Sequence, residues 1–143
     1  MTIDNHDGQI LTEIHGRRLG LDHRGFLTGV PDVRAGSETL TAASTMAAGG
    51  TSVLAAAAAA VFELVPPSVD LVGVRKRIFS GTTDAVAMYA KLTAGALVVD
   101  GSTFAVAVLT TRGTFVDLEY ISTGEIAVLG KTSTSLVTFA ATT

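Results

Sequence analysis

Residues 114–121 read Thr-Phe-Val-Asp-Leu-Glu-Tyr-Ile, and this stretch decides the fold class. Along it, apolar side chains alternate with two carboxylates, Asp117 and Glu119. A period of two with charge on one side only is typical of a half-buried antiparallel strand. The turn residues 122–124 (Ser-Thr-Gly) follow, and then residues 125–129, in which Glu125 precedes four apolar residues. The whole stretch therefore predicts a β-hairpin.

Further strands are predicted on both sides of this hairpin. Residues 103–110 are rich in β-formers and end at the turn signal Thr111-Arg112-Gly113, and a last strand is predicted over 135–140. Residues 61–65 also alternate as a strand does. We therefore expect an all-β fold, an antiparallel β-sandwich or barrel-like module.

The six alanines Ala55–Ala60 permit two interpretations. Alanine has the highest helix propensity, and Thr51 or Ser52 could cap a helix there. The run is nevertheless preceded by Gly49-Gly50 and followed by Pro66-Pro67. The context favours strands, and the helix stays open as an alternative. Residues 82–95 are also ambiguous and fit either a short helix that ends near Leu92 or another strand.

Composition limits the classes of protein to which the chain can belong. Hydrophobic residues make up 48% and charged residues 16% of the chain, and the mean hydropathy is +0.47. The longest apolar run, 53–62, is about half the length of a membrane-spanning helix, and residues 1–8 lack the pattern of a signal peptide. The absence of cysteine excludes disulfides and thiolate metal sites. A net charge of −3 does not favour nucleic-acid binding.

Charge is distributed unevenly, and this predicts two parts of the chain. Residues 1–38 hold ten of the 23 charged side chains and all three histidines. We expect residues 1–37 to form a docking arm with two short strands, near 18–21 and 25–30. Residues 38–143 are expected to form the β domain. An arm of this composition buries too little apolar area to order alone and needs a partner surface.

No pattern of residues indicates catalysis or a cofactor. The spacing of His6, His15 and His23 offers no pair suited to one metal ion. No serine lies in a G-x-S-x-G motif. Asp117 and Glu119 lie about 7 Å apart on one strand face, a separation found in glycosidases, but no other feature supports that activity. The sequence predicts no catalytic, cofactor-binding or metal-binding residue, no cofactor and no enzymatic activity.

Three segments resemble small virion proteins of tailed bacteriophages. Residues 13–29, Glu-Ile-His-Gly-Arg-Arg-Leu-Gly-Leu-Asp-His-Arg-Gly-Phe-Leu-Thr-Gly, resemble the G-L-D-x-x-G-x-L-x-G opening of such proteins. Residues 40–66 resemble their L-T…G-T…L…F-x-L-P pattern. Residues 113–131 resemble their closing hairpin, with Ile126 where tryptophan is usual. In such families the modules are trimeric capsid decoration (cement) proteins, head fibres, or tail-fibre and adaptor pieces.

The resemblance implies a virion structural protein, assembled in the host cytoplasm and located in the virion. We expect a decoration protein on the outer head surface; the alternatives are a tail-fibre or adaptor module and a carbohydrate-binding domain. The expected partners are copies of the chain, as a trimer, and the major capsid protein or another virion protein, with neither nucleic acid nor membrane. Self-association is also expected because a monomer this apolar would expose large apolar patches. The arm is expected to dock through Arg17, Arg18, Leu19, Leu21, Phe26 and Leu27. The oligomer core is expected to comprise Val116, Leu118, Tyr120, Ile126 and Val128.

Overall fold

The chain divides into two compact units, Met1–Arg34 and Ala35–Thr143. The computed structural model describes residues 10–14, 17–21, 27–28, 36–82, 86–133 and 135–141.

The first unit contains a small antiparallel sheet with the strand order β1-β2-β3. These strands are Ile10–Ile14 (β1), Arg17–Leu21 (β2) and Leu27–Thr28 (β3). Strand β2 pairs with both of its neighbours. The strands predicted near 18–21 and 25–30 correspond to β2 and β3, whereas β1 was not predicted.

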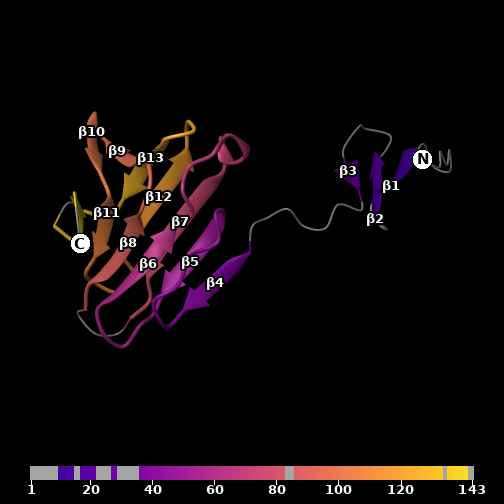
Figure 1. Ribbon diagram of the computed structural model, residues 1–143. Coiled ribbons are helices and arrows are strands. Elements are labelled where there is room, and N and C mark those ends of the chain that lie inside the picture. Colours follow the sequence, from indigo (N-terminus) through magenta and orange to yellow (C-terminus); the bar gives the residue numbers. More distant parts are fainter. Residues whose placement is uncertain are drawn as a thin grey trace. The chain divides into compact units, whose positions relative to one another are not determined.

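The second unit is a β-sandwich, which confirms the predicted all-β fold (Figure 1). One sheet has seven strands in the order β10-β9-β13-β12-β7-β5-β4, and the other has four in the order β14-β11-β8-β6. The larger sheet comprises Ser37–Leu40 (β4), Gly50–Leu54 (β5), Arg75–Ser80 (β7), Ala96–Val99 (β9), Ser102–Phe104 (β10), Phe115–Tyr120 (β12) and Glu125–Lys131 (β13). The smaller sheet comprises Ala60–Leu64 (β6), Met88–Leu92 (β8), Val106–Leu109 (β11) and Val137–Ala140 (β14). A single 3-10 turn, Val69–Leu71 (η2), lies between β6 and β7 in the described part of the chain.

The sheets are mixed, so the prediction of antiparallel strands throughout was wrong. Four pairs are parallel: β4 with β5, β5 with β7, β6 with β8, and β9 with β13. From β5 to β8 the chain alternates between the two sheets, one strand at a time. The chain reverses direction each time it crosses from one sheet to the other. After two crossings it is back in the first sheet and runs in its original direction. Consecutive strands of each sheet are therefore parallel along this part of the chain.

The alanine run forms a crossing between the sheets. Residues 55–59 connect β5 in the large sheet to β6 in the small sheet, and Ala60 begins β6. Neither a strand nor a helix covers 55–59, so both interpretations were wrong for those residues. Ala56 is buried in the core at 4% exposure. The chain must change sheets here, and this tertiary requirement overrides helix propensity.

Other predicted strands are confirmed in outline. The hairpin of β12 and β13 is present, with a register shift between Asp117 and Leu118. Residues 88–92 form β8, as the strand alternative for 82–95 required. The strand predicted over 103–110 is instead broken at Ala105, where the chain leaves one sheet as β10 and enters the other as β11.

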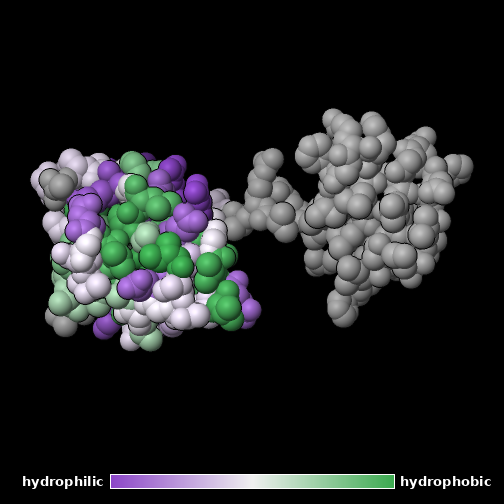
Figure 2. All heavy atoms as spheres, turned by 90° about the horizontal axis from the view of Figure 1, so that it is seen from above, coloured by the Kyte–Doolittle hydropathy of each residue, from purple (hydrophilic) through white to green (hydrophobic). Residues whose placement is uncertain are grey.

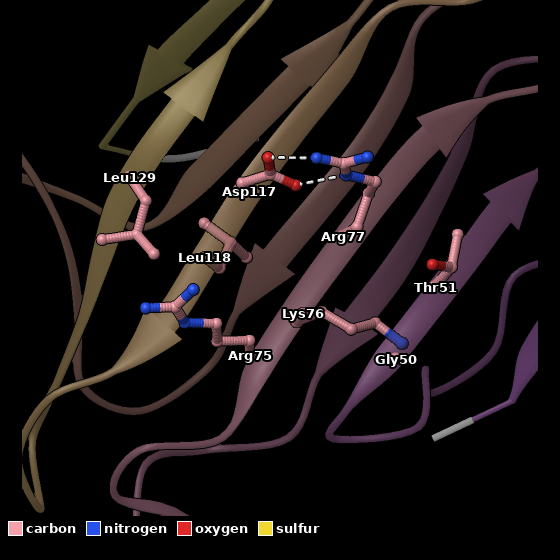
Figure 3. A pocket seen from close by; sticks show the side chains of 8 residues that line it. All are labelled: Gly50, Thr51, Arg75, Lys76, Arg77, Asp117, Leu118 and Leu129. Atoms are coloured by element: carbon pink, nitrogen blue, oxygen red, sulfur yellow. Dashed lines mark hydrogen bonds and ion pairs between the residues drawn. The ribbon is translucent and has the colours of Figure 1, made fainter. Parts of the chain in front are cut away.

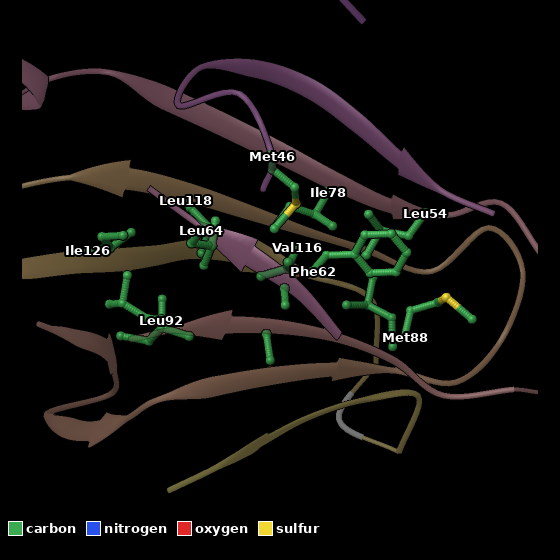
Figure 4. Close-up of a cluster of buried hydrophobic side chains, with 14 of the residues drawn as sticks. Met46, Leu54, Phe62, Leu64, Ile78, Met88, Leu92, Val116, Leu118 and Ile126 are labelled. Atoms are coloured by element: carbon green, nitrogen blue, oxygen red, sulfur yellow. The ribbon is translucent and has the colours of Figure 1, made fainter. Parts of the chain in front are cut away.

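The core lies between the sheets and is built from their inward-facing side chains (Figure 4). In β12 the inward residues alternate with half-buried outward residues, as the period of two predicts. The Tyr120 hydroxyl donates a hydrogen bond of 2.7 Å to the Val65 carbonyl, and burial raises the pKa of Tyr120. The largest buried apolar side chains are Tyr120, Phe62, Met46, Leu54, Leu64, Ile78, Met88, Leu97, Leu109, Leu118 and Ile126.

Candidate functional site

The outer face of the large sheet carries three cross-strand pairs between β7 and β12, which we call the outer ladder. Phe79 lies opposite Phe115, Arg77 opposite Asp117, and Arg75 opposite Glu119. The Phe79 and Phe115 ring centroids are 5.9 Å apart. Aromatic pairs and pairs of opposite charge are the side-chain combinations that stabilise directly opposed positions of antiparallel strands.

Arg77 is the centre of the outer ladder. Its Nε donates to Asp117 Oδ1 and its second terminal nitrogen donates to Oδ2, both at 2.6 Å. Its guanidinium also lies over Phe115 and Phe79, at 5.2 and 5.8 Å from the ring centroids. Such two-pronged pairing is the strongest form of the arginine–carboxylate interaction. The hydrogen bond to Asp117, together with its charge, raises the pKa of Arg77.

An open depression of about 460 Å³ lies over this face (Figure 3). Leu129, Arg75 and Asp117 lie around it in the close-up view. Arg75 approaches Glu119 at 3.4 Å, and its side chain is 75% exposed. The lining residues are Gly50, Thr51, Arg75, Lys76, Arg77, Asp117, Leu118 and Leu129.

The charged side chains of the outer ladder are arranged in pairs across β7 and β12. Arg77 already donates two hydrogen bonds to Asp117, and Arg75 approaches Glu119 through one nitrogen. The lining contains no histidine, no cysteine and no serine that a base could activate. Within the described residues, no group of three His, Cys, Asp or Glu side chains could hold a metal ion.

A second set of polar residues, which we call the interior cluster, lies on the inner side of the same sheet. It consists of Glu38 on β4, Ser52 on β5 and Lys76 on β7. The Lys76 side chain is fully buried, and its Nζ donates to the Gly49 carbonyl at 3.2 Å and to Glu38 Oε1 at 3.4 Å. The Ser52 hydroxyl and the Ala47 N–H also donate to Glu38 Oε1.

Burial and hydrogen bonding oppose each other in the interior cluster. Burial raises the pKa of Glu38, but the hydrogen bonds from Ser52 and Ala47 and the charge of Lys76 together lower it below the ordinary value. Burial lowers the pKa of Lys76, and Glu38 opposes that shift only in part. The cluster therefore ties the edge strand β4 to β5 and β7.

The loops at one end of the sandwich expose apolar side chains, and we call this surface the apolar end. Val69 is 71%, Val72 50% and Ile121 44% exposed. Val69 and Val72 lie between β6 and β7, and Ile121 lies between β12 and β13. A hydrogen bond of 2.7 Å from the Gly73 N–H to the Tyr120 carbonyl links these two loops. Figure 2 looks onto this end and shows hydrophobic residues gathered near the middle of the face, with hydrophilic residues around them.

The predicted docking residues fall in the first unit. Five of them lie on strands: Arg17, Arg18, Leu19 and Leu21 on β2, and Leu27 on β3. Phe26 and the three histidines lie outside the described residues. The docking role itself stays a prediction.

The residues predicted for the oligomer core lie inside the second unit. Four of them are at most 1% exposed, and Val128 packs partly buried against the same cluster. They fill the space between the two sheets of one chain. The residues are Val116, Leu118, Tyr120, Ile126 and Val128.

Sequence reasoning missed both the outer ladder and the interior cluster. The triplet Arg75-Lys76-Arg77 contains no apolar residue, so its pattern does not indicate that its middle residue is buried. A usable signal was present: basic residues at positions 75 and 77 match acidic residues at 119 and 117 if the two strands are antiparallel neighbours. That neighbour relation had no sequence signal of its own.

No protein-family model matches the chain, and no curated protein shows significant similarity to its sequence. The described residues contain no helix long and apolar enough to cross a membrane. Fold and geometry therefore define an all-β sandwich in which three ion pairs join β7 to β12 and β4.

Proposed function

We propose that this chain is a virion structural protein, a capsid decoration protein that binds the outer surface of a phage head as an oligomer. The proposal combines the sequence resemblance with one structural observation, the apolar end. Val69, Val72 and Ile121 keep 44–71% of their surface exposed, and Leu129 is the one other exposed large apolar residue among those whose burial the structure describes. Exposed apolar clusters with polar surroundings mark protein-binding surfaces.

The pairing of charges supports a role in packing. In the outer ladder the two arginines and two carboxylates neutralise each other, and in the interior cluster Lys76 faces Glu38. Paired charges on one face, together with an apolar end, suit a broad contact with another protein surface. The proposed contacts with the head are the first unit, as the docking arm, and the apolar end.

The proposal is tested by reconstitution on heads that lack the protein. Deletion of residues 2–34 removes the first compact unit and leaves Ala35–Thr143. We expect this deletion to abolish head binding while circular dichroism still shows the β-sandwich. Full binding by the truncated chain would contradict the docking role of the first unit.

A second variant tests the apolar end. Val72→Asp places a charge at an exposed apolar position and is expected to weaken head binding without loss of fold. Leu129→Asp is the matched control, because Leu129 is 51% exposed on the outer face of the large sheet. Failure of the full chain to bind heads at all would overturn the decoration proposal, and electron microscopy that located it on tails would favour the tail-fibre or adaptor alternative.

A further inference from the structure

The two lateral sides of the sandwich, along which the edge strands run, are closed to different degrees. On the side of β4 and β6, the chain itself covers the edge of β6. Thr45 forms a parallel bridge with Glu63, and the Met46 N–H donates to the Glu63 carbonyl at 2.8 Å. On the same side, Glu38 anchors β4 through the interior cluster.

The opposite side carries the edges of β10 and β14 (Figure 1). Among the described strands, β14 pairs only with β11 and β10 only with β9. Residues 101–111 and 132–143 contain neither a charged residue nor proline. Phe104 and Phe139 pack together on this side, with ring centroids 5.7 Å apart. One charge lies close to this side: Lys131 Nζ is 5.4 Å from the Phe139 ring centroid. A strand edge whose own residues include no charge and no proline nevertheless lacks most of the features that prevent pairing with another strand.

The hydrogen bonds of β14 show which of its backbone groups are already used. The Thr110 N–H donates to the Leu136 carbonyl at 3.3 Å, and the Ala105 N–H donates to the Ala140 carbonyl at 3.0 Å. The carbonyls of the even-numbered residues therefore face β11. Because backbone groups alternate in direction along a strand, those of the odd-numbered residues face the open side.

The groups on the open side form a short row. The Val137 N–H already donates to the Ser133 carbonyl at 3.2 Å. The row therefore begins at the Val137 carbonyl, continues with both backbone groups of Phe139, and ends at the N–H of Ala141. When a second copy of the strand runs antiparallel to the first, each donor of this row lies opposite an acceptor of the other copy. The row is therefore complementary to itself.

We propose that β14 pairs with β14 of a second copy of this chain, antiparallel and about a two-fold axis beside Phe139. The Phe139 N–H of each copy donates to the Phe139 carbonyl of the other. The Ala141 N–H of each copy donates to the Val137 carbonyl of the other. The two four-stranded sheets then become one continuous sheet, and the β14 edges of both copies are closed.

This inference rests on the proposed function, because it names the surface through which the structural protein associates with itself. It also departs from the resemblance in one respect. A two-fold strand pair gives a dimer, whereas the virion proteins that the sequence resembles are trimers. Native mass spectrometry separates the two outcomes directly.

The test uses Thr138→Lys in the full chain. Thr138 is exposed, and in the proposed pair the two copies of this residue are diagonal neighbours across the axis. Two lysines there repel each other, and we expect the dimer dissociation constant to rise about tenfold or more. Thr39→Lys on the edge strand β4 is the matched control: the same change at an exposed position of the opposite side.

A second variant, Ala141→Pro, removes the N–H that ends the row and is expected to weaken the dimer in the same direction. Sedimentation velocity measures association, and circular dichroism verifies that each variant is folded. A monomeric wild-type chain, a trimer, or a dimer unaffected by both variants would each overturn the strand pairing. Head binding by the full chain remains a separate measurement, so failure of the pairing and failure of the decoration proposal are distinguishable.

Discussion

Two neighbouring residues of β7 carry the same charge into opposite surroundings. Lys76 points into the sandwich with a side chain that is 0% exposed, whereas Arg77 points outward with a side chain that is 49% exposed. Each is paired with a carboxylate from another strand, Glu38 for Lys76 and Asp117 for Arg77. Water can replace Asp117 if it is removed, but it cannot reach Lys76 to replace Glu38. The same kind of ion pair is therefore expected to matter far more on the inner face than on the outer face.

The largest effect is expected for Glu38→Ala. Removal of this carboxylate leaves Lys76 buried with only the Gly49 carbonyl as partner. Uncompensated buried charges are strongly destabilising, and because Glu38 itself is partly exposed we expect a loss of about 2–3 kcal/mol in the free energy of unfolding. Urea denaturation of the full chain measures it. If Glu38→Ala lowered the free energy of unfolding only as much as a variant of the outer ladder does, ion pairs on the two faces would contribute equally to stability.

The interior cluster also predicts an acid-sensitive stability. The folded state holds the pKa of Glu38 below its ordinary value of 4.5, so the stabilisation is present above pH 4.5. It is lost as the pH falls from 4.5 through the lowered pKa, because the folded state must then take up a proton that the unfolded state binds more readily. The urea midpoint of unfolding, measured at a series of pH values, is expected to fall as the pH drops below 4.5. Glu38→Gln is the control, and its midpoints should change less there.

A smaller effect is expected for Lys76→Met. Methionine keeps most of the volume and removes the buried charge, while Glu38 retains its hydrogen bonds from Ser52 and Ala47. Replacement of a buried charge by an apolar side chain is often close to neutral, so we expect a change within about 1 kcal/mol. The double variant Glu38→Ala/Lys76→Met should then be more stable than Glu38→Ala alone. Equal stability of the two would mean that Lys76 is not the cause of the loss.

The smallest effect is expected for Asp117→Asn on the outer face. The pair with Arg77 is exposed to solvent, so its loss should lower the urea midpoint only slightly, and added salt should shrink the difference further. Arg75→Ala, which breaks the longer contact with Glu119, serves as the comparison within the same ladder. A loss here as large as that of Glu38→Ala would contradict the assigned role of burial.

Local patterns were sufficient to predict part of the fold. The alternation along 114–121 identified β12 and its inward face, and the turn at 122–124 identified the hairpin with β13. Both depend on residues close in sequence, where side-chain period and turn chemistry act directly. For residues 82–95 the local pattern also allowed a strand, because the apolar residues there fit one face of a strand.

The remaining features depend on contacts between distant residues. The break at Ala105 and the crossing at 55–59 arise because the chain must change sheets, and no local propensity marks a change of sheet. The interior cluster joins Glu38, which marked only a domain boundary in the sequence, to Lys76, which belonged to a run of basic residues. One sequence cannot indicate which strands are neighbours, so neither the parallel pairs nor the buried ion pair was predictable.

The central position of β7 has a consequence for the order in which the sandwich can be completed. Its two neighbours are β5, made earlier in the chain, and β12, made much later: Ile78 pairs with Ser52 on one side and with Val116 on the other. During synthesis, β7 therefore presents a bare strand edge until residues 115–120 have left the ribosome. That edge starts with Arg75-Lys76-Arg77, and mutual repulsion of these cations hinders nascent chains from joining each other there.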